Sequence, residues 1–166
     1  MKKTVFALLI VAGICSAASA QDYPQGTAYK SALGVRLSSS AAMINNSVSF
    51  KQFISDKTAI EAYFSFGDPL ALGAMLEFHK PLSASGLQYY YGVGGYIGFL
   101  KTLNPNTQKT STDPNFGAQG VIGLDYKFSN VPLNLSLDWK PELNIVSDIN
   151  FEPAAIGLTA RFTFGK

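Results

Sequence analysis

The stretch Ile156-Gly-Leu-Thr-Ala-Arg-Phe-Thr-Phe164 decides the fold class of this chain. Its apolar phase carries Ile156, Leu158, Ala160, Phe162 and Phe164. The opposite phase carries Ala155, Gly157, Thr159, Arg161 and Thr163. Because successive side chains of a β-strand point to opposite faces, this stretch predicts a strand with one apolar and one polar face. A barrel of such strands has either a polar interior and an apolar exterior, or the reverse arrangement.

Seven further segments alternate in the same way. The predicted strands cover residues 28–38, 47–55, 59–66, 70–80, 87–100, 116–128, 133–140 and 155–164. Short turns at 56–57, 83–86 and 130–132 are interleaved with connections at 39–46, 67–69, 102–115 and 141–154, of which only 67–69 is brief. This arrangement is typical of bacterial outer-membrane barrels, whose short turns lie in the periplasm. The predicted fold class is all-β, an eight-stranded antiparallel up-and-down transmembrane β-barrel with both mature termini periplasmic.

The charged side chains of these strands share one phase, which we predict to face the lumen. They are Lys30, Arg36, Lys51, Glu61, Glu77, His79, Asp125, Lys127, Asp138, Lys140 and Arg161. A cation on the lipid face costs ~2 to 4 kcal/mol at the membrane midplane, so this segregation favours an apolar exterior. Because an eight-stranded barrel is only just wide enough for its side chains to fill it, we expect a paired, hydrogen-bonded plug. Glycines on the inward phase, such as Gly117, Gly123 and Gly157, make room for large neighbours such as Arg36, Tyr90 and Tyr96.

Aromatic residues gather at the strand ends, where a membrane protein places amphipathic rings at the headgroup level. The predicted membrane-interface aromatics are Tyr29, Phe66, Phe78, Tyr89, Tyr91, Phe99, Tyr126, Phe128, Trp139, Phe162 and Phe164. Lys80 and Lys101 lie just beyond these rings, where a long side chain keeps its ammonium in the interface. Periodicity by itself leaves open a soluble, lipocalin-like barrel with the opposite orientation; the aromatic placement and the loop lengths favour the membrane barrel.

The N-terminus predicts export. Lys2 and Lys3 precede an apolar run that ends in small residues around Ala18 and Ala20, which is typical of a secretory signal peptide at 1–20. The run is about half as long as the ~20 residues that a membrane-spanning helix needs. The predicted mature domain, 21–166, then has 11 basic and 11 acidic residues and no cysteine. This equal charge balance does not favour binding to nucleic acid. No disulfide is expected in the mature domain.

The sequence offers no set of catalytic residues. His79 is the sole histidine, and with no cysteine in the mature chain it falls short of a transition-metal site. Glu77 and His79 share a strand face about 6.6 Å apart, so a proton relay is conceivable, but a satisfied lumen pair is favoured. We therefore expect no catalytic residue, no metal and no cofactor. The glycine-rich run from Gly92 to Gly98 lacks the strand-to-helix context of a nucleotide loop.

Two segments carry a family resemblance that extends over residues 27–166. The stretch Gly123-Leu-Asp-Tyr-Lys-Phe, followed by a short turn and Leu133-Asn-Leu-Ser-Leu-Asp-Trp, and the ending Gly157-Leu-Thr-Ala-Arg-Phe-Thr-Phe164, resemble the last hairpin and closing strand of small eight-stranded outer-membrane barrels of the OmpA and OmpX type. The resemblance implies residence in the cell outer membrane, contact with its lipid and lipopolysaccharide, and insertion by the barrel-assembly machinery. Gly165 and Lys166 follow Phe164, whereas such proteins usually end on the aromatic residue.

The function expected from these observations is structural or surface-interactive, in a monomer with a plugged lumen. The polar connection 102–115 is a candidate surface for an extracellular partner, although such loops are often merely solvated. Two alternatives stay open: a narrow pore for ions or small solutes, and a lipid-modifying enzyme of the outer membrane. A lipid A enzyme needs its nucleophile and base near the outer leaflet, whereas His79 lies near the predicted periplasmic turn at 83–86.

Overall fold

The computed structural model describes residues 29–38, 44–66, 69–103, 110–146, 149–153 and 155–165. The predicted signal peptide at 1–20 lies outside these residues, so its prediction stands untested. Within the described ranges, no helix has the length and apolar character needed to cross a membrane.

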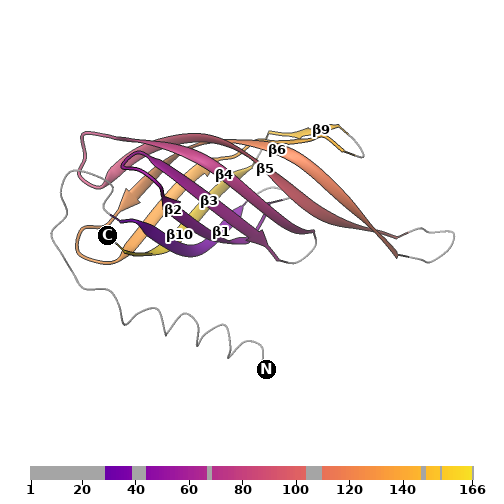
Figure 1. The fold of residues 1–166 in the computed structure, drawn as a ribbon, viewed down its shortest axis with the longest axis horizontal. Helices are drawn as coiled ribbons and strands as arrows, with labels where there is room; N and C mark the ends of the chain where they lie inside the picture. Colours follow the sequence, from indigo (N-terminus) through magenta and orange to yellow (C-terminus); the bar gives the residue numbers. More distant parts are fainter. Residues whose placement is uncertain are drawn as a thin grey trace, which may run out of the picture.

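The described residues form a closed antiparallel barrel (Figure 1). Its strands are β1 (Ser31–Ser38), β2 (Ser47–Phe53), β3 (Thr58–Ser65), β4 (Leu70–Pro81), β5 (Leu87–Leu103), β6 (Thr110–Lys127), β7 (Leu133–Trp139), β8 (Glu142–Asn144), β9 (Asn150–Glu152) and β10 (Ile156–Phe164). The first and last strands pair from Ser31 opposite Phe164 to Ser38 opposite Gly157, which closes the barrel. The predicted fold class is confirmed.

The ten strands occupy eight barrel positions because two of them continue others. β7 pairs with β6 up to Trp139 opposite Ile122, and β8 resumes on the same strand at Glu142 opposite Gln119. Pro141 lies between β7 and β8, and a proline has no backbone N–H to donate to a ladder. β9 pairs with β8 and leads past Pro153 into β10 in the same way.

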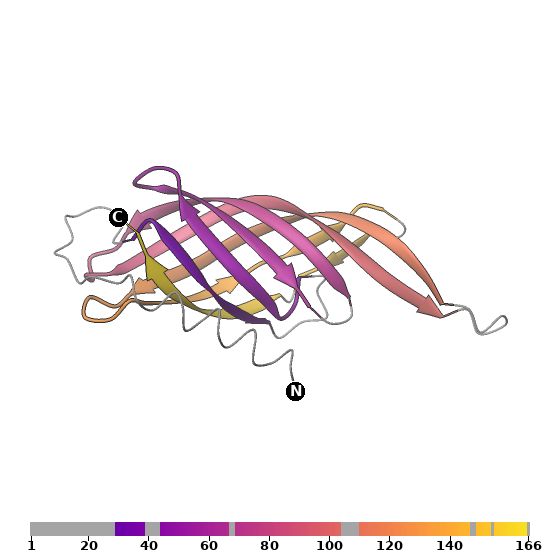
Figure 2. The same cartoon turned by 60° about the horizontal axis from the view of Figure 1, so that its bottom comes forward.

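The predicted loops at 102–115 and 141–154 are partly strand, which corrects two predicted boundaries. β5 and β6 remain paired out to Leu103 opposite Thr110, and they form a ribbon that projects beyond the rest of the barrel (Figure 2). Apart from Pro114, the segment 110–115 is polar on both phases, so it shows no apolar–polar alternation. The C-terminal end of the chain lies at the opposite end of the barrel from this ribbon (Figures 1 and 2).

The two faces of the barrel wall have opposite chemistry. On β3, the buried phase holds Ala59, Glu61, Tyr63 and Ser65, whereas Ile60 and Phe64 are each 43% exposed. Near the middle of other strands, Ile122, Leu137 and Leu158 are each 53% exposed. Apolar residues therefore cover the outside and polar residues fill the inside. A soluble lipocalin-like carrier would need the opposite orientation.

Candidate functional site

The lumen is the candidate site, because most of the ionisable residues on the inward phase of the strands are buried there. Lys51 on β2 lies at the centre of the cluster. Its Nζ is 2.9 Å from a carboxylate oxygen of Glu77, 3.3 Å from one of Asp125 and 3.8 Å from one of Glu61. It also lies 4.5 Å from the centroid of the Tyr90 ring. One cation thus holds together carboxylates from three other strands.

Arg161 on β10 is the second cation of this cluster. Its guanidinium forms a buried ion pair with Glu61 and donates to Ser49 Oγ at 2.9 Å. Its Nη1 donates to Ser136 Oγ at 2.8 Å and to the side-chain oxygen of Asn134 at 3.2 Å. Multiple hydrogen bonds of this kind are what a buried charge requires if its desolvation is to be offset. Asn134 also donates to Asp125, which connects Arg161 to the Lys51 cluster.

A separate ion pair lies nearer the projecting ribbon. Nη2 of Arg36 on β1 is 2.6 Å from Oδ1 of Asp138 on β7, and both side chains are fully buried. The hydroxyl of Tyr90 donates to the other oxygen of Asp138 at 3.1 Å. Lys140 donates to the hydroxyl of Tyr63, which in turn donates to Glu61. Tyrosine hydroxyls therefore extend the hydrogen-bonded cluster along the lumen.

His79 occupies the end of the cluster nearest the short turns. Its Nε2 lies 3.1 Å from Glu77, and its ring stacks on Tyr90 with centroids 5.0 Å apart and planes 9° apart. Phe53 packs against the same ring edge-on at 4.9 Å. Three aromatic or charged neighbours thus fix the ring, which favours a structural lumen pair with Glu77, although the buried Nδ1 of His79 has no hydrogen-bond partner among the described residues.

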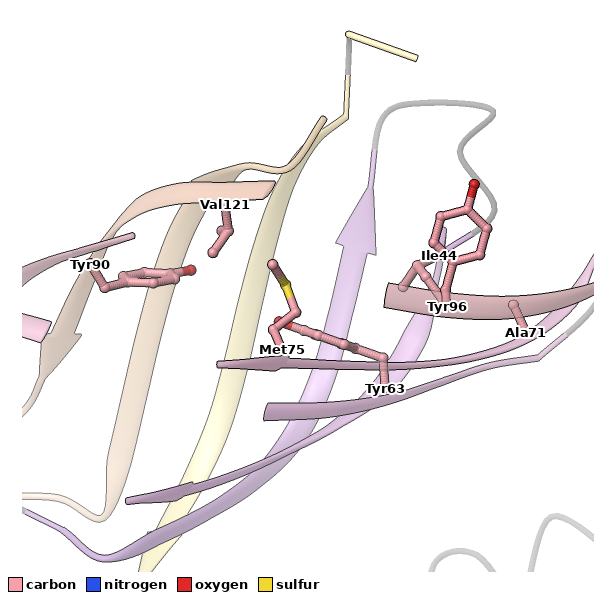
Figure 3. Packing of buried hydrophobic residues seen from close by; sticks show 7 residues of the cluster. All are labelled: Ile44, Tyr63, Ala71, Met75, Tyr90, Tyr96 and Val121. Atoms are coloured by element: carbon pink, nitrogen blue, oxygen red, sulfur yellow. The ribbon is translucent and has the colours of Figure 1, made fainter. Parts of the chain in front are cut away.

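Apolar side chains close the lumen at both ends of the charge cluster. At the short-turn end, Tyr29 packs edge-on against Phe53 with ring centroids 5.1 Å apart, beside Ala32 and Ala59. Toward the other end, an apolar cluster runs from Tyr90 through Met75 and Tyr63 to Ile44 and Tyr96 (Figure 3). Ile44 comes from the β1–β2 connection and is fully buried, and its N–H donates to Glu142 at 3.2 Å.

Glycines make the tight filling possible, as the sequence predicts. A Cβ atom at Gly117 would lie 2.2 Å from the ring of Tyr96, which is its cross-strand partner on β5. A Cβ at Gly123 would lie 2.8 Å from the ring of Tyr90, again its cross-strand partner. Each tyrosine therefore lies over the bare backbone of the glycine opposite.

Two residues that precede β1 differ from their predicted positions. Lys30, predicted in the lumen, is exposed, and Tyr29, predicted at the membrane interface, is only 5% exposed. The reason is that β1 begins at Ser31, so the alternation does not extend back to these residues. Backbone hydrogen bonds hold Lys30 at the barrel end, since its N–H donates to Gly165 at 3.3 Å and its carbonyl accepts from Phe53 at 2.8 Å.

The other predicted residues lie on their expected faces. Nine lumen residues besides Lys127 are at most 2% exposed. Lys127 is 5% exposed and donates to the carbonyl oxygens of Phe128 and, at 2.9 Å, Val131 in the β6–β7 turn. The ten remaining aromatics are partly or well exposed on the outside; they are Phe66, Phe78, Tyr89, Tyr91, Phe99, Tyr126, Phe128, Trp139, Phe162 and Phe164.

Sequence reasoning missed several neutral members of the cluster. Ser49, Tyr63, Asn134 and Ser136 all bind the charged groups directly. Each lies on the inward phase of its strand, so the alternation itself carried the signal. Alternation could not predict the burial of Ile44, because this residue lies in the connection between β1 and β2. In the part of the chain that the structure describes, no group of three His, Cys, Asp or Glu side chains has metal-binding geometry.

The architecture also occurs in a solved structure. No protein-family model matches the chain, and no curated protein matches its sequence. The crystal structure of the N-terminal β-barrel domain of Pseudomonas aeruginosa OprF matches with a TM-score of 0.56 and 14% sequence identity, over 81% of this chain and 95% of that domain. The chain has the fold of the OprF barrel. At this identity the likeness shows the fold, and it agrees with the eight-stranded outer-membrane barrel predicted from the sequence.

Proposed function

We propose that the chain is a monomeric outer-membrane β-barrel, exported by its signal peptide, with a structural or surface-interaction role and a lumen closed by its own side chains. The observation that carries the proposal is the pairing of an apolar exterior with a filled, charge-paired interior. In water the exterior would be an apolar patch far larger than the few hundred Å² that soluble monomers usually expose. In a membrane it contacts acyl chains.

The proposed orientation places both mature termini in the periplasm and the β5–β6 ribbon outside the cell. The described C-terminal end lies with the short turns, as in outer-membrane barrels generally (Figure 1). Insertion by the barrel-assembly machinery and contact with lipid and lipopolysaccharide follow from this location. The connection 102–115, whose described residues belong to this ribbon, is the proposed surface for an extracellular partner.

A plugged lumen is favoured over a narrow pore because buried side chains occupy the lumen along much of its length. Arg36, Tyr63 and Arg161 are among the largest fully buried side chains, and the apolar groups of Ile44 and Phe53 lie beyond them on either side. An ion entering the barrel would have to displace these groups and break ion pairs. The enzyme alternative lacks support, because His79 is enclosed by Glu77, Tyr90 and Phe53.

Planar-bilayer conductance combined with gel mobility tests the proposal. We expect the refolded mature chain to run differently before and after boiling, as a closed barrel does, and to give no stepwise conductance. As a control for detection, Arg36 and Arg161 are both replaced by serine, which removes the two largest buried side chains and admits water. Stepwise conductance by the unaltered barrel would contradict the plug, and free solubility without detergent would contradict the membrane location.

A further inference from the structure

The outer wall has a groove where β4 begins beside the projecting ribbon. β4 starts at Leu70, which pairs with Phe99, whereas β5 continues to Leu103 in partnership with β6 alone. The groove at this step has a volume of about 420 Å³ and is lined by Leu70, Phe99, Lys101 and Thr112. Its size lies within the roughly 300 to 1,000 Å³ of small-ligand sites.

The groove changes polarity along the barrel axis. Phe99 lies opposite Leu70 on one side and Pro114 on the other, so this level is apolar. Two residues farther along the ribbon, Lys101 lies opposite Thr112 on the same face. The groove therefore leads from the apolar belt to an ammonium and a hydroxyl. A lipid has this same order of groups, with acyl chains followed by a polar headgroup.

Charge complementarity identifies the headgroup as anionic. Lys101 is exposed, and it forms no ion pair with any residue in the described ranges. Asp113 is its nearest acidic neighbour along the ribbon, but Asp113 lies opposite Leu100, on the alternate phase of the strands. An ammonium at the membrane surface attracts phosphate, and the hydroxyl of Thr112 can donate to the same group.

We propose that this groove binds the lipid A part of lipopolysaccharide, with one acyl chain against Leu70 and Phe99 and a phosphate at Lys101 and Thr112. The choice of lipid A rests on the proposed orientation, which places the base of the ribbon, where β4 begins, at the outer leaflet. The site gives the surface-interaction role a defined ligand and a defined location on the wall.

Titration of the detergent-solubilised mature barrel with lipid A, followed by native mass spectrometry, tests the site. We expect Lys101→Gln to weaken the first binding event about fivefold, as for the loss of one lysine near an anionic surface. The matched control is Lys80→Gln, which removes an exposed outward lysine at the other end of the barrel, beside Tyr89 and Tyr91. This variant should bind lipid A as the unaltered barrel does.

Two further probes assign the chemistry. Dephosphorylated lipid A should bind equally to the unaltered barrel and to Lys101→Gln, and phosphatidylglycerol should bind more weakly than lipid A. Equal lipid A binding by the unaltered barrel and Lys101→Gln would overturn the inference, as would equal binding of phosphatidylglycerol and lipid A. Both variants must keep the heat-dependent mobility of a closed barrel. Loss of that mobility in the unaltered chain would count against the proposed function. If the barrel is intact but Lys101→Gln leaves lipid A binding unchanged, the result counts against this site only.

Discussion

Arg36 reaches Asp138 by passing over Gly157. The ion-paired residues lie on β1 and β7, and Gly157 lies on β10, the strand between them, directly opposite Asp138. A Cβ atom at Gly157 would lie 2.2 Å from Nη2 of Arg36 and 2.3 Å from its Cζ. The glycine is therefore part of the ion pair's geometry, since any side chain there would occupy the path of the guanidinium.

Gly157→Ala should destabilise the barrel by about 1 to 3 kcal/mol, the usual cost of overpacking a filled interior. Urea unfolding in lipid vesicles measures the free energy of unfolding. The matched control is Gly120→Ala on β6, because a Cβ there would have its nearest neighbours at 3.8 Å, from Pro141, and 4.0 Å, from Gly92. If both variants lose equal stability, the guanidinium is not confined as described.

The Arg36–Asp138 pair itself should show strong coupling in a double-mutant cycle. Asp138→Leu leaves a buried guanidinium without its carboxylate, and we expect a loss of about 3 to 5 kcal/mol. The loss should be large because Nε and Nη1 of Arg36 have no hydrogen-bond partner among the described residues. Adding Arg36→Met removes the stranded charge and should recover much of the stability. Additive losses in the same unfolding assay would show that the two side chains do not interact.

Except for Lys30, the sequence predicted which charged residues enter the lumen, but not which of them meet. Arg36 and Asp138 were both expected inside, yet they are 102 residues apart in the chain. Their contact depends on the stagger of neighbouring strands, which period-two alternation leaves undetermined. The same limit applies to Lys51, whose three carboxylate partners lie on β3, β4 and β6.

Element ends were predicted less well than element centres. β8 and β9 have only three residues each, too few to show alternation, and they form because they continue the ladders of β7 and β10 beyond the prolines. Lys30 is held by backbone hydrogen bonds with Gly165 and Phe53, and Tyr29 packs its ring against Phe53, so contacts that side-chain alternation does not report determine their positions.

An arginine on the outer wall should lower the free energy of unfolding only where the wall contacts the acyl chains of the lipid. Leu137 on β7 is 53% exposed and lies opposite Leu158 and Leu124 on the neighbouring strands. We expect Leu137→Arg to lower the free energy of unfolding in lipid vesicles by about 2 to 4 kcal/mol. Asn130→Arg is the control, because Asn130 is exposed in the β6–β7 turn. Little difference between the two would show that Leu137 does not contact acyl chains.

The single tryptophan provides a probe of lipid contact that needs no mutation. Trp139 is 45% exposed on the outer wall at the end of β7, and the chain has no other tryptophan. Lipids brominated near the headgroup should quench its fluorescence more than lipids brominated at the ends of their acyl chains, because an interfacial indole lies close to the headgroup level. Emission unaffected by either lipid would place the indole away from the bilayer.

The orientation of the barrel can be tested in intact cells with single cysteines, since the predicted mature chain has none of its own. Thr110 is exposed at the start of β6, on the projecting ribbon, and Asn130 is exposed at the opposite end of the barrel. If the ribbon faces outward, Thr110→Cys should react with a membrane-impermeant maleimide added to whole cells, whereas Asn130→Cys should react only after the outer membrane is permeabilised. Both positions are solvent-exposed, so a difference in labelling reports the side of the membrane and not burial. The reverse pattern would place the termini outside, and it would also move the Lys101 groove to the inner leaflet, where lipopolysaccharide is not the expected ligand.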